Sequence, residues 1–423
     1  MTTPPSGIPH VVIVGGGFAG LWATRALARD GVRITLVDRR NHHLFQPLLY
    51  QVATAGLSAP DIAAPLRHIL RGQRNVEVRL GEVIDIDAAA RTVTLTDGDS
   101  LRYDFLLLAS GATHAYFGHD AWAPHAPGLK TLDDALAIRR RLLLAFERAE
   151  AAASAEERAA WLDFAIVGGG PTGVELAGTL AEIARHTLRN EFRRIDPAEA
   201  KVRLIEAGPR VLASFPESLS ARARAQLERL GVEVLTGTPV ADIDADGYTL
   251  GDARVRSHTV LWAAGVAASP LGALLDAPRD RAGRVLVQPD LSVPGRAELF
   301  VAGDLASVQQ DGKPVPGVAP AAKQMGAHVA RVIRARLRNE PAPTFRYRDF
   351  GNLATIGRMA AVVHLGRLKL SGLPAWWFWL FIHIFFLIGF RNRLIVLIDW
   401  AWAYWSYQRH ARIILGEQRP PLP

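Results

Sequence analysis

The sequence of 423 residues contains no cysteine. Disulfides, thiolate metal sites, iron–sulfur clusters and cysteine nucleophiles are therefore excluded. The segment from Met1 to His10 is short and polar, without the charged and then apolar pattern of a secretion signal. We therefore expect the body of the protein to stay in the cytoplasm.

Long runs of lysine and arginine are also missing. The net charge is +8, but the positive charge is mostly scattered arginine. This distribution favours an anionic lipid surface as a partner over nucleic acid. A hydrophobic content of 49% with 21% charged residues is typical of a globular protein, and the length allows two or three domains.

Two glycine-rich loops stand out against this background, at residues 15–20 and 168–173. Each follows an apolar run that predicts a buried strand and precedes a helical pattern. Such a loop lets the backbone approach a diphosphate, which then lies at the helix N-terminus. The glycines that we expect to bind cofactors are Gly15, Gly17, Gly20, Gly168, Gly170 and Gly173. Two such loops predict an α/β protein with two Rossmann-like dinucleotide-binding domains, between whose cofactors electrons pass.

An acidic residue ends the second expected strand of each domain and should accept hydrogen bonds from a ribose. Asp38 follows Gly20 by 18 residues, whereas Glu206 follows Gly173 by 33. The longer gap implies an extended helix or an insertion over residues 183–200. Because Glu206 would repel a 2′-phosphate, NADH is favoured over NADPH, although Arg210 is near enough to soften that preference.

Other expected elements complete an internal repeat of strand, glycine loop, helix, strand and acid. Residues 76–95 alternate as antiparallel strands do. Residues 131–160 lack glycine and proline, which predicts a helix. Later strands close at Ala109 and Gly265, which we expect at the cofactor sites.

The histidines do not predict a metal site. His42 and His43 are adjacent, and His114, His119 and His125 lie near Asp120. No spacing among them matches a pair on one helix face. We interpret them as structural or loop residues. A Ser/His/Asp arrangement with a nucleophile elbow is also not visible.

The tail is rich in tryptophan. Residues 373–390 contain no charged side chain, with His383 as the one ionisable group. As a helix they would extend about 27 Å, close to the thickness of a bilayer core. A second stretch, residues 394–407, carries Asp399 among aromatic residues and is followed by Arg409 and Arg412. The tail could span the bilayer, lie in one leaflet, or be buried in a dimer interface.

Together with the segment 299–304, the two loops resemble the two-dinucleotide-binding flavoproteins. In that group the first loop holds FAD and the second holds the nicotinamide cofactor, which implies that Asp304 lies near the ribityl chain and pyrophosphate of FAD. A narrower resemblance is to the type II NADH dehydrogenases, the single-subunit NADH:quinone oxidoreductases. It is carried by the segments 42–51, 170–178, 204–210 and 319–324 and by the tryptophan-rich tail.

The resemblance implies that hydride passes from NADH to the flavin and that two electrons and two protons reach a membrane quinone. Glu175 matches the glutamate of the family beside the nicotinamide and flavin, and Gln324 matches a glutamine on the quinone side. Some members carry a second glutamine where this chain has Pro320, so the resemblance does not define the exact quinone contacts. By position alone, Glu175 lies in a first helical turn, where a carboxylate is stabilised by the helix dipole.

The family is monotopic, so we expect the tail to lie in one leaflet on the cytoplasmic face of the cell inner membrane. One or two tail helices cannot form a proton relay across the membrane, so we expect no proton pumping. The expected domains are 1–115 and 284–340 for FAD, 116–283 for NADH, 341–372 as a connecting segment and 373–423 as membrane-anchoring helices.

Two other functions stay open. One is a flavin reductase of the same fold that acts on a soluble acceptor or oxygen. The other is a membrane-docked flavoprotein that senses NADH and signals by binding partners. Sulfide:quinone and disulfide reductases are excluded, because the chain has no cysteine.

Overall fold

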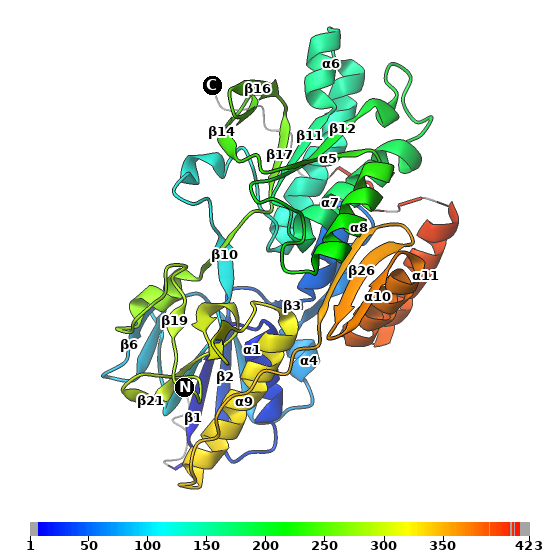
Figure 1. Cartoon of the computed structure of the whole chain (residues 1–423). Helices are drawn as coiled ribbons and strands as arrows, with labels where there is room; N and C mark the ends of the chain where they lie inside the picture. Colours follow the sequence, from blue (N-terminus) through cyan, green and yellow to red (C-terminus); the bar gives the residue numbers. More distant parts are fainter. Residues whose placement is uncertain (1–6, 389, 407, 410, 415–423) are drawn as a thin grey trace. The chain divides into compact units, whose positions relative to one another are not determined.

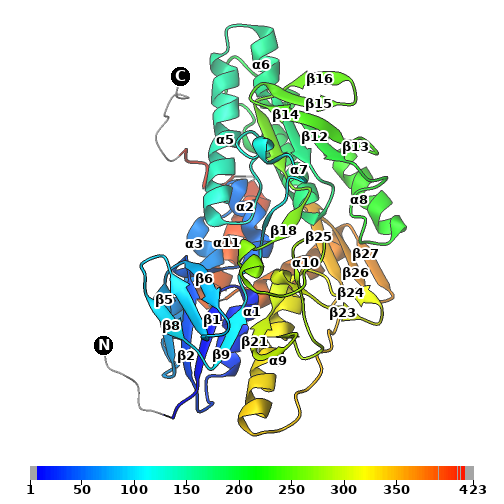
Figure 2. The same cartoon turned by 90° about the vertical axis from the view of Figure 1, so that its left-hand side faces the viewer.

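The computed structural model describes residues 7–388, 390–406, 408–409 and 411–414 (Figure 1, Figure 2). The chain divides into two compact units, each assembled from three segments. The first comprises residues 1–44, 63–113 and 266–350, and the second comprises 45–62, 114–265 and 351–423. The last residues of the expected anchoring region and Tyr407 lie outside the described residues.

The first unit contains a six-stranded sheet. Its strands in spatial order are β20 (Ser292–Val293), β21 (Arg296–Val301), β9 (Phe105–Leu108), β1 (His10–Val14), β2 (Arg33–Asp38) and β5 (Val76–Leu80). All neighbours are parallel except β20 and β21. The expectation of antiparallel strands over 76–95 is therefore wrong for β5 and holds for β6 (Val83–Asp87) and β7 (Thr92–Leu95). β5 is the edge strand of this sheet, and its polar residues Glu77 and Arg79 alternate with Val76, Val78 and Leu80 although its one neighbour in the sheet, β2, is parallel.

Two helices of the first unit pack against each other at close range. They are α1 (Phe18–Ala26), which follows the first glycine loop, and α9 (Ala319–Leu337). A Cβ atom at Gly326 would lie 2.0 Å from the carbonyl oxygen of Ala19, so only glycine permits this approach. The Arg334 guanidinium also donates to the Asp30 carboxylate at 2.8 Å.

The second unit repeats the strand and helix order of the first. Its parallel sheet has the order β13 (Val232–Thr236), β12 (Lys201–Glu206), β11 (Asp163–Val167) and β17 (Thr259–Trp262). The helix expected over 131–160 is two helices, α5 (Leu132–Ala151) and α6 (Ala155–Trp161). The break occurs because Ser154 caps α6 by accepting a hydrogen bond from the Glu157 N–H.

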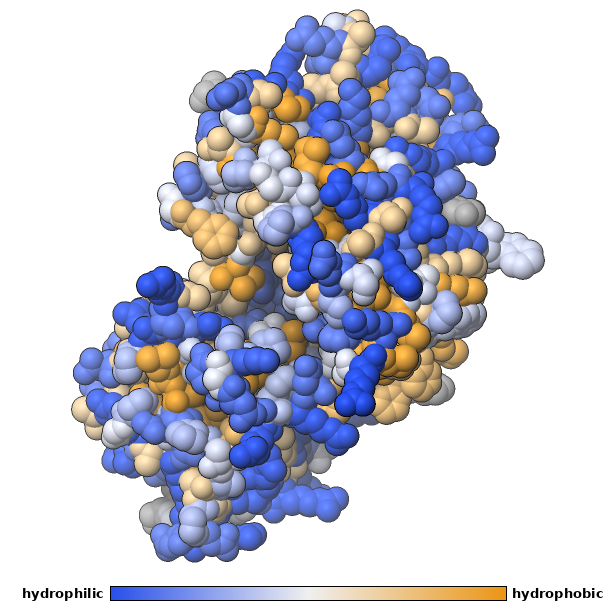
Figure 3. Space-filling view, in the orientation of Figure 1, coloured by the Kyte–Doolittle hydropathy of each residue, from blue (hydrophilic) through white to orange (hydrophobic). Residues whose placement is uncertain are grey.

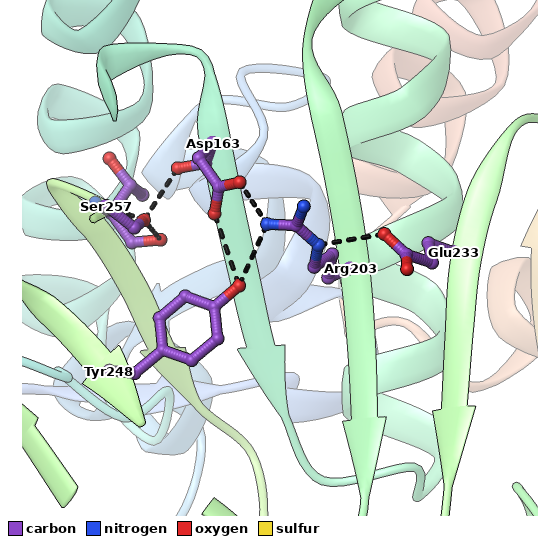
Figure 4. Close-up of polar contacts among 6 residues, drawn as sticks. Asp163, Arg203, Glu233, Tyr248 and Ser257 are labelled. Atoms are coloured by element: carbon purple, nitrogen blue, oxygen red, sulfur yellow. Dashed lines mark hydrogen bonds and ion pairs between the residues drawn. The ribbon is translucent and has the colours of Figure 1, made fainter. Parts of the chain in front are cut away.

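A buried polar network ties this sheet together at the start of β11 (Figure 4). Asp163 accepts hydrogen bonds from Arg203 and from the Tyr248 hydroxyl, the latter at 3.3 Å. The Arg203 guanidinium also reaches Glu233 at 2.8 Å, and the Ser257 hydroxyl donates to the Asp163 carbonyl at 2.7 Å. Burial raises the pKa of Asp163, and the Arg203 charge opposes that rise. The network stands at the opposite end of β11 from the second glycine loop, so we interpret it as structural.

The expected connecting segment 341–372 contains a small antiparallel sheet. Its strands are β25 (Asn352–Gly357), β26 (Ala360–Leu365) and β27 (Leu368–Ser371). This sheet packs on α7 (Pro171–Glu182), on α8 (Glu217–Arg229) and on the tail (Figure 2). A Cβ atom at Gly178 would lie 1.6 Å from the Ile356 carbonyl oxygen, so the strand lies directly on the helix backbone.

The tail forms two helices, α10 (Leu373–Phe386) and α11 (Phe390–Ser406). Within the described residues, neither is both long and apolar enough to cross a bilayer. Their inner side is aromatic: Trp379 stacks on His383 and lies 5.3 Å from the Trp400 ring. Trp400 also donates to the Gln51 side chain at 2.7 Å, which explains why segment 45–62 belongs to this unit rather than to the first.

Candidate functional site

The first glycine loop joins β1 to α1 and is shaped by close backbone contacts. Gly15 has φ of +105°, and a Cβ atom there would lie 2.4 Å from the Ala109 carbonyl oxygen. A Cβ atom at Gly20 would lie 1.8 Å from the Gly15 carbonyl oxygen. A Cβ atom at Gly17 would meet nothing within 4 Å, and no side chain caps α1 at this residue. This uncapped helix start has the form of an anion-binding site for a group such as the FAD pyrophosphate.

Two acids lie in the first unit where the loop predicts them. Asp38 ends β2 and accepts a hydrogen bond from the Gly16 N–H at 2.5 Å and from the Arg40 N–H at 2.7 Å. Asp304 follows β21 on a short turn at residues 303–305, and a Cβ atom at Gly317 would lie 3.3 Å from its carboxylate. Both acids remain partly exposed. The first unit therefore fits a dinucleotide such as FAD in its sterics and in its donor set.

The second loop, between β11 and α7, has the same geometry. Gly168 has φ of +113°, and a Cβ atom there would lie 2.4 Å from the Ala263 carbonyl carbon. A Cβ atom at Gly173 would lie 1.9 Å from the Gly168 carbonyl oxygen, whereas one at Gly170 would meet nothing within 4 Å. At Gly265 a Cβ atom would meet the Phe117 ring at 2.4 Å, which crowds this edge of the site.

Glu206 ends β12 and is hydrogen-bonded to the backbone of the second loop. Its carboxylate accepts from the Gly169 N–H and from the Gly208 N–H, each at 2.6 Å. The Arg210 guanidinium donates instead to three backbone carbonyl oxygens, including that of Ala213 at 2.7 Å and that of Phe215 at 2.8 Å. Because Arg210 is engaged in this way, it is poorly placed to bind a 2′-phosphate.

The long gap before Glu206 contains both of the expected features, a longer helix and an inserted segment. After α7 the chain makes a π-helical turn at Ile183–Thr187 and a 3₁₀ turn at Pro197–Glu199. π-Helical turns are rare and are often found at functional sites. The spacing of glycine and acid indicates that something is inserted, but it carries no signal for a π-helical turn.

Glu175 lies in the first turns of α7, two residues after the third glycine of the loop. Burial raises the pKa of Glu175 well above its ordinary value, and a hydrogen bond from the Thr355 N–H acts in the opposite direction. A carboxyl group in such a setting can hold a proton near neutral pH. Its position on the helix follows from the sequence, whereas its burial under β25 does not.

Gln324 lies on α9 in the first unit, whereas Glu175 belongs to the second. Its side-chain amide donates to the Arg348 carbonyl oxygen and accepts from the Arg348 N–H, both at 2.9 Å. A side-chain amide can donate two hydrogen bonds and accept two, so that of Gln324 can donate one more and accept one more. Pro320 stands in the first turn of α9, where it removes no intrahelical hydrogen bond.

The neighbour of Gln324 was not identified from the sequence. The Lys323 ammonium lies 4.4 Å from the centre of the Trp22 ring and 5.2 Å from that of Phe18. Burial lowers the pKa of Lys323 to about 8. His43 packs edge-on against Phe18 and shares a hydrogen bond with the Gly16 carbonyl oxygen, and burial lowers its pKa to about 4.

The remaining histidines lie in separate settings. His114 faces Asp134 at 3.4 Å, and His119 stacks on Trp122. Among the residues that the structure describes, no group of three or more His, Cys, Asp or Glu side chains could hold a metal ion.

The outer side of the tail is apolar. On α10 the exposed side chains include Trp377 and Phe381, and on α11 they include Ile398, Trp402 and Trp405, the last 88% exposed. In the space-filling view, apolar side chains gather where Figure 1 draws these two helices (Figure 3). Such a surface, with tryptophan at its edge, is typical of a membrane interface.

Comparison with known proteins agrees with these features. The sequence profile of pyridine nucleotide-disulphide oxidoreductases matches residues 9–326, and the profile of the NDH2 C-terminal domain matches residues 350–405. The type II NADH:quinone oxidoreductase Ndh of Mycobacterium tuberculosis is 46% identical over 99% of this chain and 92% of its own length. The demethylphylloquinone reductase NdbB of Synechocystis is 31% identical over 93% of this chain and 95% of its own length.

Among solved structures, NDH2 from Plasmodium falciparum in complex with NADH has the same fold. Its TM-score is 0.87 at 20% identity, over 96% of this chain and all of that one. The expected fold class, with two Rossmann-like units and a C-terminal NDH2 domain, is confirmed. The chain therefore belongs to the type II NADH:quinone oxidoreductases.

Proposed function

We propose that this protein oxidises NADH and passes two electrons to a membrane quinone through bound FAD. The observation that carries the proposal is the match to a type II NADH:quinone oxidoreductase over 99% of the chain. That match includes both glycine loops, each with its acid hydrogen-bonded to the loop backbone. The two loops supply a place for a donor and a place for a carrier.

In this proposal the first unit holds FAD. Gly15, Gly17 and Gly20 would admit its pyrophosphate, Asp38 would accept hydrogen bonds from a ribose, and Asp304 would lie by the ribityl chain. The start of α1, which no side chain caps, and the partly exposed Asp38 support these roles. When bound, FAD supplies a two-electron carrier between a hydride donor and a quinone.

The second unit would hold NADH as an exchangeable substrate. Gly168, Gly170 and Gly173 would admit the pyrophosphate, and Glu206 would accept hydrogen bonds from the adenosine ribose. The fixed Glu206 carboxylate and the engagement of Arg210 with backbone carbonyls both favour NADH over NADPH.

Two residues would act at the reacting ends. Glu175 would handle a proton beside the nicotinamide and flavin, and its raised pKa supports that role. Gln324 would contact the quinone or the flavin edge with the remaining donor or acceptor of its amide. Because this amide already holds the backbone of Arg348, it is a rigid contact rather than a mobile one.

The apolar tail surface would place the protein on one leaflet, on the cytoplasmic face of the membrane, without crossing it. A double variant Trp402→Ser/Trp405→Ser tests this directly, because both side chains are well exposed. Binding to vesicles that contain anionic lipid should weaken by roughly tenfold, since two interfacial aromatic anchors are lost. The control Leu80→Ser removes an exposed apolar side chain of the first unit and should bind as the wild type does.

The function itself is tested on purified holoenzyme by adding NADH and then quinone under anaerobic conditions. NADH should bleach the flavin absorbance and a quinone should restore it, faster than air-saturated buffer does in a parallel sample of the reduced enzyme. In stopped-flow experiments, Gln324→Ala should slow the second step by about tenfold and the first by less than about twofold. Bleaching without restoration by any quinone would favour a flavin reductase with a soluble acceptor or a sensor of NADH.

A further inference from the structure

A cavity of about 80 Å³ lies beside α7 inside the second unit. It is lined by side chains from α2 (Leu49–Ala53), α7, β25, α11 and the segment that follows α11, among them Tyr50, Thr179, Glu182, Thr355 and Arg409. The volume is large enough for more than one water molecule, and the lining offers hydrogen-bond partners. A polar cavity of this kind holds water rather than remaining empty.

Three polar side chains of α7 lie along one face of the helix. Glu175, Thr179 and Glu182 follow one another at intervals of four and three residues, which places them above one another. Thr179 and Glu182 line the cavity, and Thr355, which also lines it, donates its N–H to Glu175. Glu175 and two residues that line the cavity, Thr179 and Glu182, therefore lie in one row along the helix.

β25 holds both carboxylates of this row. Thr355 donates to Glu175, and the Arg358 N–H, just after the strand, donates to Glu182. A Cβ atom at Gly357 would lie 2.7 Å from the Glu182 carboxylate, so a larger residue there would close the space. The strand thus connects the two acids in space, although they lie more than one helical turn apart.

Glu182 is almost buried, with 12% of its side chain exposed. The charged and titratable groups that face it are His186 from its own helix, Arg358 from the turn after β25 and Arg409 from the segment after α11. The Arg409 guanidinium lies 3.4 Å from the Glu182 carboxylate, and His186 is exposed to solvent. Burial raises the pKa of Glu182, and the Arg409 charge limits that rise. Glu182 therefore stands between an exposed imidazole and the cavity.

The proposed reaction needs a proton from solvent. NADH, one quinone and one proton give NAD⁺ and one quinol, so hydride carries two electrons and one hydrogen while the second proton comes from water. Glu175 and Glu182 are separated by a helical rise of about 10 Å, which is too far for direct transfer. The Thr179 hydroxyl lies between them on the helix, and the cavity that it lines has room for water molecules to complete the path.

We propose that Glu182 is a proton-relay residue, which passes protons from the His186 surface through the cavity to Glu175. The proposal rests on the proposed function, because it assigns a source for the proton that quinone reduction consumes. It gives a role to a buried acid that the dinucleotide loops do not use.

The test is Glu182→Gln in the holoenzyme, measured with a water-soluble short-chain quinone so that membrane binding does not matter. Reoxidation by quinone should slow by about tenfold or more at pH 8, while reduction by NADH changes by less than about twofold. Added formate should restore part of the lost rate, and Glu182→Asp should retain more of it than Glu182→Gln. A structural defect would not respond to a small weak acid.

Glu191→Gln is the matched control. Glu191 also pairs with the tail, since its carboxylate lies 2.6 Å from the Arg412 guanidinium, but it does not line the cavity. This variant should leave both half-reactions and their pH profiles unchanged. Equal slowing in Glu191→Gln and Glu182→Gln, without rescue by formate, would show that tail attachment matters and would overturn the relay.

The same experiment separates the two proposals. If the wild type reduces quinone and Glu182→Gln is indistinguishable from it, the relay is wrong and the proposed function stands. If the wild type itself fails to reduce any quinone, the proposed function is wrong, whatever Glu182 does.

Discussion

The two glycine loops have the same backbone geometry. The residue two positions after the third glycine nevertheless differs between them in type and in environment. Trp22 lies two residues after Gly20, and Glu175 lies two residues after Gly173. Trp22 faces the Lys323 ammonium of α9, whereas Glu175 accepts a backbone hydrogen bond from β25. The loop therefore fixes where this side chain lies on the helix, whereas the element that packs on the helix determines the environment of the side chain.

This difference explains how one scaffold can hold two cofactors with different tasks. In the first unit a helix packs on α1 and brings a half-buried cation, which the Trp22 ring stabilises. In the second unit a strand packs on α7 and leaves an acid half-buried. Each contact depends on one glycine, Gly326 in the first unit and Gly178 in the second.

The largest expected effect comes from filling these two close approaches. Gly178→Ala should destabilise the protein by about 3 kcal/mol or more, because its Cβ atom would overlap the Ile356 backbone, which cannot move as a side chain can. Gly326→Ala should cost somewhat less, since its nearest atom, the Ala19 carbonyl oxygen, is slightly farther. Chemical denaturation measures both, and Gly31→Ala is the control because a Cβ atom there meets nothing within 4 Å. Equal stability of all three variants would mean that the glycines do not control packing.

Replacing each expected ribose-binding acid with arginine should show that the two loops bind different cofactors. Glu206→Arg removes a carboxylate that accepts two loop hydrogen bonds, so kcat/KM for NADH should fall by about 10- to 100-fold while preference shifts toward NADPH. Asp38→Arg should instead lower the flavin content per protein and leave the ratio of NADH to NADPH activity in the remaining holoenzyme unchanged. Steady-state kinetics and flavin absorbance give the two readouts. A nucleotide shift in Asp38→Arg would reverse the assignment of the loops.

The smallest effects should appear in how stability depends on pH, and they should have opposite senses. The folded pKa of Glu175 is raised, so its burial costs stability above its unfolded pKa, and Glu175→Gln should stabilise the protein increasingly as pH rises. The folded pKa of Lys323 is lowered to about 8, so its charge costs stability below pH 8. Lys323→Met should therefore stabilise below pH 8, and the gain should fade between pH 8 and about 10.4. The net gain should be roughly 1 kcal/mol, less than the full pKa shift implies, because the side chain is only half-buried and the substitution also removes the cation–π contacts with Trp22 and Phe18.

Thermal unfolding at a series of pH values measures both variants against the wild type. Gln226→Met, on α8, serves as a control without a titrating group. If the stability gains of Glu175→Gln and Lys323→Met changed with pH in the same direction, the two sites would not bury opposite charges. The contrast between the two units would then be wrong.

Much of the fold could be predicted because its signals are local. A glycine at Gly15 or Gly168 is required by a positive φ, and Asp38 or Glu206 follows at the end of the next strand. Steric rules of this kind act within a few residues, so the sequence displays them directly. The family resemblance then identified Glu175 and Gln324, whose roles stay predictions.

What could not be predicted depends on residues far apart in the chain. Glu182 meets Arg409 across 227 positions, and Gly178 meets Ile356 across 178. No local pattern distinguishes Glu182 from an ordinary helix-surface acid, because its burial is produced by a strand and a tail that arrive much later in the sequence. The antiparallel prediction for β5 was wrong for a similar reason, since its alternation does not show that its neighbour, β2, is parallel.

The sequence by itself determined the α/β class, the two dinucleotide loops, the family and the apolar, tryptophan-rich tail. All of these follow from short-range sterics and from apolar patterning. Only the tertiary structure decided that Glu182 is almost buried, that Lys323 is partly desolvated and that a cavity forms beside α7. Those properties depend on desolvation, and desolvation is set by whatever chain packs over a group after folding.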